Sequence, residues 1–210
     1  MNTDAPAEQF PIVAEIAAVD LGVLQPASVN APSSAAGNAY RQLTGLVRSS
    51  LTGLRQPSLA VVGPAAGTGR TTIAVNIAAA LVADGVRALL VTPSAGVIDI
   101  PNLHVLPINL CQVDDGGQPI GQPDAQQLRD ALDDCASLVD VVIFDTESCD
   151  RSSWAYTAAA AADLTLVSVM TNRTPLDAYD TMRDQLMALG VRVLGVAVNA
   201  EAQVPDLVRV

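Results

Sequence analysis

Residues 63–72 read Gly63-Pro-Ala-Ala-Gly-Thr-Gly-Arg-Thr-Thr72, and this glycine-rich segment is the strongest indication of the fold. It follows a short β-rich run at 58–62 and precedes a long apolar helix predicted at 71–83. Glycines let backbone N–H groups turn inward, and the N-terminus of a helix favours a bound anion. The order of strand, glycine-rich turn and helix is therefore typical of a phosphate-binding loop in an α/β domain.

Apolar strands and helices alternate on both sides of this turn. Strands are predicted at 58–62, 87–92, 103–107, 139–144, 164–170 and 191–198. Helices are predicted at 38–54, 71–83, 128–138, 154–162 and 174–189. Continuous apolar strands between helices indicate a parallel sheet that is covered on both faces. The expected fold class is α/β, with a doubly wound, mostly parallel sheet and the architecture of a P-loop NTPase.

The first 37 residues differ in composition from the rest of the chain. They are rich in alanine, proline, serine and acidic residues and contain no arginine, which predicts a flexible N-terminal tail and linker at 1–37. The periodic pattern begins at Asn38 and continues to about residue 200. We therefore expect one α/β domain at 38–200 and a short C-terminal tail at 201–210.

The charge balance excludes several classes of partner. The 210 residues carry 22 acidic and 11 basic side chains, every basic one an arginine, for a net charge of -11. Such a chain is poorly suited to neutralising nucleic-acid phosphates. No apolar run approaches the roughly 18–20 residues that span a bilayer, and no secretory signal is recognised. Three scattered cysteines fit a reducing compartment, so we expect a cytoplasmic protein without direct membrane insertion.

Several loop residues are candidates for binding a nucleotide with Mg²⁺. Thr71 falls where a loop hydroxyl would meet the metal ion, and Arg70 falls where a lysine would reach the β and γ phosphates. The match is incomplete, because Pro64 stands where the motif has its first glycine. The alternative interpretation is a tight turn that binds no ligand. The other residues that would cradle the phosphates are Gly67, Thr68, Gly69 and Thr72.

A second signal is the acid that ends the apolar run 141–145. A carboxylate at the tip of a buried strand, here Asp145, is where a Walker-B acid orders the Mg²⁺ shell. Taken alone, Asp145 has an alternative interpretation as an acid that simply caps the next segment of the chain. Together with Thr71, in the expected chain order, it favours a magnesium–nucleotide site.

Five phrases in chain order resemble the bacterial tyrosine kinases, which belong with the MinD/ParA group of P-loop ATPases. These kinases are cytoplasmic ATPase domains that work with polysaccharide co-polymerases in capsule and exopolysaccharide export. The resemblance covers roughly residues 38–200. The phrases are Asn38-Ala-Tyr-Arg-Gln-Leu43, the loop at 63–72, Asn76-Ile-Ala-Ala-Ala-Leu81, Val141-Val-Ile-Phe-Asp-Thr146 and Gly190-Val-Arg-Val-Leu-Gly-Val-Ala-Val-Asn199.

The resemblance implies roles for residues outside the loop. It makes Asp145 the Walker-B acid and places Asn199 near the base of bound ATP or ADP. Arg41 would be the surviving part of a glutamate-arginine-arginine oligomerisation motif, in which Asn38 and Thr44 stand where an acid and a second arginine belong. A homo-oligomer is therefore one expected assembly. The implied partner is a membrane polysaccharide co-polymerase or a more complete ATPase paralogue, which would hold the protein peripherally at the inner membrane.

The departures from the family bear on activity. The loop lysine is replaced by Arg70, and the acids of the Walker-A′ motif are replaced by Thr92-Pro-Ser-Ala-Gly96. The phrase after Walker B reads Asp145-Thr-Glu-Ser148, and residues 201–210 contain no tyrosine. The ammonium group of lysine is a compact point charge, whereas the guanidinium group of arginine is planar and its side chain is longer. Arg70 therefore retains the positive charge but places it away from the position that a lysine charge would occupy at the phosphates.

These departures predict a degenerate, regulatory or adaptor domain with weak or absent ATP hydrolysis and no tyrosine kinase activity. Nucleotide binding itself stays open at this point. Two alternatives also remain: an active MinD/ParA-type ATPase that positions a cellular cargo, and a nucleotide-independent structural scaffold. Hydrolysis separates the first alternative from the degenerate domain, and nucleotide-dependent oligomerisation separates the second.

Overall fold

The computed structural model describes residues 9–18, 25–93, 98–108 and 123–200. Three stretches named in the sequence analysis lie outside the described residues. They are the C-terminal tail at 201–210, residues 1–8 and 19–24 of the predicted N-terminal tail, and residues 94–96 of the altered Walker-A′ segment. No helix within the described ranges combines the length and the apolar character that a membrane span requires.

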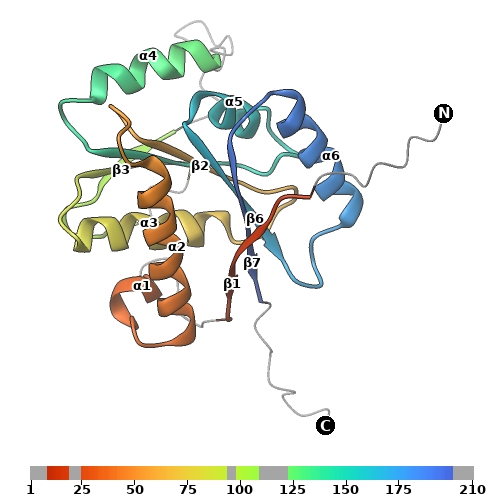
Figure 1. Cartoon of the computed structure of the whole chain (residues 1–210), viewed down its shortest axis with the longest axis horizontal. Coiled ribbons are helices and arrows are strands. Elements are labelled where there is room, and N and C mark those ends of the chain that lie inside the picture. Colours follow the sequence, from red (N-terminus) through yellow and green to blue (C-terminus); the bar gives the residue numbers. More distant parts are fainter. Residues whose placement is uncertain (1–8, 19–24, 94–97, 109–122, 201–210) are drawn as a thin grey trace, which may run out of the picture.

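The described residues form a seven-stranded sheet in the order β1-β7-β6-β2-β5-β3-β4, with every neighbouring pair parallel. The predicted α/β fold is therefore confirmed (Figure 1). The strands are β1 Ile12–Ile16, β2 Ser58–Val62, β3 Ala88–Thr92, β4 His104–Pro107, β5 Val141–Asp145, β6 Leu164–Met170 and β7 Val193–Asn199. The helices are α1 Ala27–Asn30, α2 Ala35–Leu51, α3 Arg70–Ala83, α4 Ala125–Cys135, α5 Trp154–Ala161 and α6 Leu176–Ala188.

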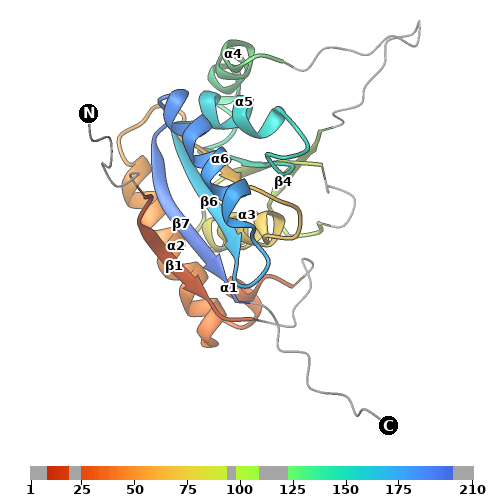
Figure 2. The ribbon, with the colours of Figure 1, turned by 90° about the vertical axis from the view of Figure 1, so that its right-hand side faces the viewer.

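Two apolar layers cover the sheet. Alternate residues of a strand point to opposite faces, so Leu59 and Val61 of β2 pack on one side and Ala60 and Val62 on the other. The first layer contains α1, α2 and α3, and the second contains α4, α5 and α6 (Figures 1 and 2). Because both faces of β2 are buried, its residues are continuously apolar after Ser58, as expected for a central parallel strand.

The structure differs from the predicted N-terminal tail. Residues 12–16, which fall in the predicted flexible segment, form the edge strand β1, which pairs in parallel with β7 and buries Ile16. Residues 27–30 form α1, where the Ser28 hydroxyl donates to the Asn76 backbone oxygen at 2.9 Å. The folded unit therefore begins upstream of residue 38. The sequence signal is weak because β1 is short and its partner lies near the far end of the chain.

Two observed helices begin and end three residues earlier than the predicted ranges 38–54 and 128–138. Helix α2 ends at Leu51, because Gly53 adopts a left-handed conformation with φ +87°. Helix α4 ends at Cys135, so Leu138, the last residue of the predicted helix, is 66% exposed. In both cases apolar residues continue at helical spacing beyond the last residue of the helix.

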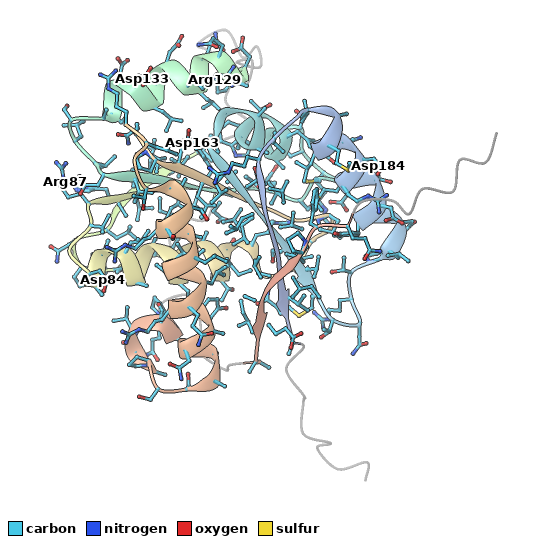
Figure 3. The ribbon with its side chains drawn as sticks, viewed as in Figure 1. Asp84, Arg87, Arg129, Asp133, Asp163 and Asp184 are labelled. Carbon is cyan, nitrogen blue, oxygen red and sulfur yellow. The ribbon has the colours of Figure 1, made fainter. Side chains whose placement is uncertain are left out.

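Of the charged side chains labelled in Figure 3, Asp84, Arg87, Arg129, Asp133 and Asp184 lie at the periphery of the molecule, whereas Asp163 is partly buried and accepts hydrogen bonds from Ser58. Arg87 pairs with Asp140 at 2.6 Å, and Arg48 pairs with Asp84 at 2.7 Å, in each case with both partners about half exposed. Exposed ion pairs of this kind contribute little to stability. The charges that bear on function are instead the buried ones next to the glycine-rich loop.

Candidate functional site

The glycine-rich loop joins the end of β2 to the start of α3. Gly67 and Gly69 have φ of +76° and +90°, a region that other residues rarely occupy. Gly69 is also the N-cap of α3, which begins at Arg70. The loop therefore presents backbone N–H groups and a helix N-terminus toward one point, the arrangement that suits a phosphate.

Thr68 is held at the centre of the loop by its backbone. Its carbonyl oxygen accepts hydrogen bonds from the Ser168 hydroxyl at 2.6 Å and from Asn199 Nδ2 at 2.8 Å. Its own hydroxyl is buried and has no partner among the described residues. An unpartnered buried hydroxyl inside such a loop fits an oxygen-rich ligand.

Arg70 lies against the loop that carries it. Its Nη1 donates to the backbone oxygen of Ala65 at 2.8 Å and, more weakly, to that of Gly63 at 3.3 Å. Burial lowers the pKa of Arg70, and the nearby Asp145 carboxylate opposes that shift. The position that the sequence analysis assigns to a phosphate contact is therefore occupied by a guanidinium that binds its own loop.

Asp145 ends β5 and is completely buried. The Thr92 hydroxyl donates to its Oδ2 at 2.6 Å, and the Thr71 hydroxyl donates to its Oδ1 at 3.1 Å. Burial raises the pKa of Asp145, while these two hydrogen bonds and Arg70 act in the opposite direction. Thr92, which ends β3, therefore faces the buried Asp145 carboxylate with a hydroxyl.

Replacing Asp145 with asparagine is expected to stabilise the ligand-free protein at neutral pH, on the order of 1 kcal/mol. Because folding raises the pKa of Asp145, the contribution of this carboxyl to folding stability is fully present below pH about 4, where it is protonated. That contribution is lost as the pH rises through the folded-state pKa. Thermal melting of the two proteins from pH 4 to pH 8 measures this. A variant less stable than wild type at pH 8 would contradict the burial argument.

A cavity of about 180 Å³ lies beside the loop. Thr72, in the first turn of α3, and Asn199, at the end of β7, both contribute to it. The remaining lining residues are Ile16, Ala17, Ala18, Ala27, Tyr40, Gly69, Asn76, Met170 and Ala200. The structure thus places the predicted base contact, Asn199, next to the loop.

Several residues at the site are not identified by the sequence analysis. The sequence marks Tyr40 only as part of a family phrase within a predicted helix, and its side chain reaches the cavity. The Cys149 backbone N–H donates to the Gly63 oxygen at 3.0 Å. The half-buried Cys149 thiol, whose pKa is raised by burial, forms a hydrogen bond with Tyr156. No local pattern marks these contacts, because each depends on which strand ends lie side by side.

Arg41 is separate from this cavity. It is exposed on α2 and lines a hollow with Arg48, Ser28 and Val29. Thr44, the position of the missing second arginine, is buried, and its hydroxyl donates to the Tyr40 backbone oxygen at 2.8 Å. Of the three positions that the resemblance assigns to an oligomerisation motif, only Arg41 therefore offers a charge at the surface.

The residues present fit a nucleotide phosphate better than they fit a metal ion. The left-handed glycines, the helix N-terminus and the Thr68 hydroxyl suit an anion. For Mg²⁺, Thr71 and Asp145 supply oxygen ligands, but these atoms bond to each other. Across the described ranges, no three His, Cys, Asp or Glu side chains form a metal-binding group.

Solved structures share this fold. The chimerical protein CapA2B2 has a TM-score of 0.71 and 17% identity, with 90% of this chain and 94% of that chain covered. The kinase domain of the Escherichia coli tyrosine kinase ETK has a TM-score of 0.70 and 15% identity, with 91% and 90% covered. The Pyrococcus furiosus cell division ATPase MinD has a TM-score of 0.52 and 19% identity, with 69% and 72% covered.

No protein-family model and no curated protein sequence matches the chain. At such low identities, the structural likeness establishes the architecture alone. That architecture is the P-loop fold of bacterial tyrosine kinase domains and of MinD-type ATPases, as the sequence motifs predict.

Proposed function

We propose that this chain is a degenerate, tyrosine-kinase-like P-loop domain. It acts as a regulatory or adaptor subunit in bacterial exopolysaccharide or capsule polymerisation and export. It binds ATP or ADP with Mg²⁺, hydrolyses ATP weakly or not at all, and has no tyrosine kinase activity. The single observation that carries this proposal is the environment of Asp145, whose two hydrogen-bonding side-chain neighbours are the threonines Thr71 and Thr92.

Nucleotide binding is supported by the loop. Backbone N–H groups of residues 67–69 and the start of α3 would hold the phosphates, with the hydroxyls of Thr68, Thr71 and Thr72 alongside. Asp145 and Thr71 would hold Mg²⁺, which supplies charge neutralisation of the phosphates when bound. Arg70 must leave the Ala65 carbonyl before its guanidinium can reach a phosphate, so the loop starts from a position that opposes tight binding.

Weak hydrolysis is supported by the missing carboxylate. Phosphoryl transfer needs a group that orients the attacking hydroxyl or water, and general-base assistance typically contributes 10²–10⁴-fold in rate. Thr92, at the end of β3, offers a hydroxyl already donated to Asp145. A neutral hydroxyl engaged as a donor cannot act as that base.

The partner is proposed from the sequence resemblance and from the exposed face of α2. A membrane polysaccharide co-polymerase, or a more complete ATPase paralogue, would hold the domain peripherally at the cytoplasmic side of the inner membrane. Arg41 is an exposed cation without an ion-pair partner among the described residues. It would contact an acidic residue of the partner or of a second copy of this chain.

A second candidate is an active MinD-type ATPase. It is favoured by the likeness to MinD and by the preserved pair of Thr71 and Asp145. The two proposals differ in the expected rate of hydrolysis, and both differ from a nucleotide-independent scaffold in their response to nucleotide.

The test is titration calorimetry with Mg-ATP and Mg-ADP, combined with phosphate release and light scattering. We expect measurable binding and a rate far below the roughly 1 per second of competent enzymes. A rate at or above that value would contradict the degenerate domain and support the MinD-type ATPase. No binding, and no change in light scattering on addition of Mg-ATP, would support the scaffold.

A further inference from the structure

We propose that a cleft at the amino end of the sheet, where the strands begin, binds Leu176 and Asp177 of a second copy of this chain. The contact joins two different surfaces, so it is heterologous and adds further copies unless the rotation closes it into a ring. It uses neither the glycine-rich loop nor Arg41 and needs no nucleotide. The inference therefore goes beyond the proposed function.

The cleft is mostly apolar and has a volume of about 270 Å³. It lies where α2 and α3 end and where β5 begins. Sites that bury a drug-sized ligand occupy roughly 300–1,000 Å³, so a cleft just below that range suits an apolar side chain of a protein partner. The apolar residues that line it include Val47, Leu51, Leu54, Pro57, Leu81 and Val86.

The charges around the cleft leave one cation without a counter-charge. The two acids beside it, Asp84 and Asp140, already form ion pairs with Arg48 at 2.7 Å and with Arg87 at 2.6 Å. Arg55 is exposed one residue beyond the lining and has no ion-pair partner in the described part of the chain. The cleft therefore favours an apolar group that is accompanied by a negative charge.

The start of α6 presents that combination. Leu176 is the first residue of α6 and, at 73%, the most exposed large apolar side chain among the described residues. Asp177 follows it in the first turn, is exposed and forms no ion pair within the described ranges. Because a helix already holds both residues, binding them costs little ordering of the backbone. A leucine with a free carboxylate beside it complements the apolar cleft and Arg55.

The two surfaces lie at opposite ends of the sheet. Helix α6 follows β6, so Leu176 is at the carboxyl end of the strands, whereas the cleft is at the amino end of β5. Figure 1 shows the start of α6 and the end of α3 on opposite sides of the molecule. One copy therefore cannot fill its own cleft, and the contact forms only between copies.

An anionic membrane surface suits the cleft less well than a second copy does. Asp84 and Asp140 stand beside the cleft, and the chain carries a net charge of -11, so an extended negative surface would repel it. A second copy places a single carboxylate at Arg55. Because two copies of the same net charge also repel each other at longer range, we expect association to be weak and to need high protein concentration.

The experiment measures the average mass of the nucleotide-free protein by analytical ultracentrifugation from about 10 µM to about 1 mM, the range of small, weak interfaces. The mass of wild type is expected to rise with concentration. Leu176→Glu should weaken association at least about 10-fold, because it brings a charge into the apolar cleft. Leu106→Glu changes another exposed leucine, on β4 and outside both surfaces, and as the matched control should associate as wild type does.

A charge exchange tests the pairing of Arg55 with Asp177. Arg55→Glu and Asp177→Arg should each weaken association about 3–10-fold, because each brings two like charges together. The double variant Arg55→Glu/Asp177→Arg should recover association, since the contact again joins opposite charges. All the changed side chains are exposed, so each variant should melt close to the wild-type temperature, which excludes misfolding as the cause of a loss.

Several results would overturn the inference. One is a constant mass over the whole concentration range. Another is wild-type association by Leu176→Glu, because a different surface, such as that around Arg41, would then join the copies. A double variant that stays as weak as the single ones would remove the pairing of Arg55 with Asp177. Cosedimentation of a monomeric protein with phosphatidylglycerol vesicles, lost in Arg55→Glu, would assign the cleft to a membrane surface instead.

Discussion

Arg70→Lys is expected to bind Mg-ATP about 10-fold more tightly than wild type and still to hydrolyse it slowly. In the ligand-free protein the guanidinium donates from Nη1 to the Ala65 oxygen, and this hydrogen bond must break before the side chain can turn toward a phosphate. An ammonium group is compact and meets phosphate as a point charge, so it needs no such rearrangement of a planar group. Titration calorimetry and phosphate release measure the two effects separately.

The double variant Arg70→Lys/Thr92→Asp tests the second defect. It should hydrolyse ATP about 100-fold faster than Arg70→Lys alone, since a carboxylate at position 92 would orient the attacking group. The added acid lies next to buried Asp145, so ligand-free stability should fall, and melting with Mg-ADP controls for this. If Arg70→Lys alone reaches about 1 per second, the loss of the Walker-A′ acid is not what limits the domain.

Gly195→Val is expected to destabilise the fold by about 2–4 kcal/mol, the sum of backbone strain and overpacking. Gly195 has φ +151°, and a Cβ atom there would lie 2.4 Å from the Pro11 backbone oxygen and 2.5 Å from Val13 Cγ1. The glycine therefore permits β1 to approach β7. Urea unfolding at equilibrium measures the change in stability, and nucleotide affinity should fall with it because Ile16 of β1 lines the cavity.

The matched control is Gly45→Ala on α2. A Cβ atom on Gly45 meets nothing within 4 Å, and alanine is favoured over glycine in a helix by about 0.5–1 kcal/mol. This variant should unfold at the same or a higher urea concentration than wild type. If Gly195→Val also unfolds at the wild-type midpoint, the docking of β1 contributes nothing to stability.

Much of the architecture could be predicted from local patterns. The run 58–62, the glycine-rich turn and the apolar helix after it are contiguous in the chain, so their order alone indicates a P-loop fold. Asp145 is also found locally, because an acid that ends a buried strand stands out against its apolar neighbours. Edge strand β1 is missed, since a short strand whose partner is β7 carries little signal of its own.

The features of the site also divide into those that the sequence shows and those that only the fold shows. The residue types at the loop and at the end of β3 can be read directly from the amino-acid sequence, which therefore shows that a lysine and a carboxylate are missing. The folded structure is needed to show that Arg70 binds the Ala65 oxygen, that Thr92 reaches Asp145 and that the Asn199 amide bonds to the Thr68 carbonyl oxygen. The residue type is a property of each single position in the chain. A hydrogen bond between distant residues depends instead on strand order and register, which bring together atoms far apart in the chain.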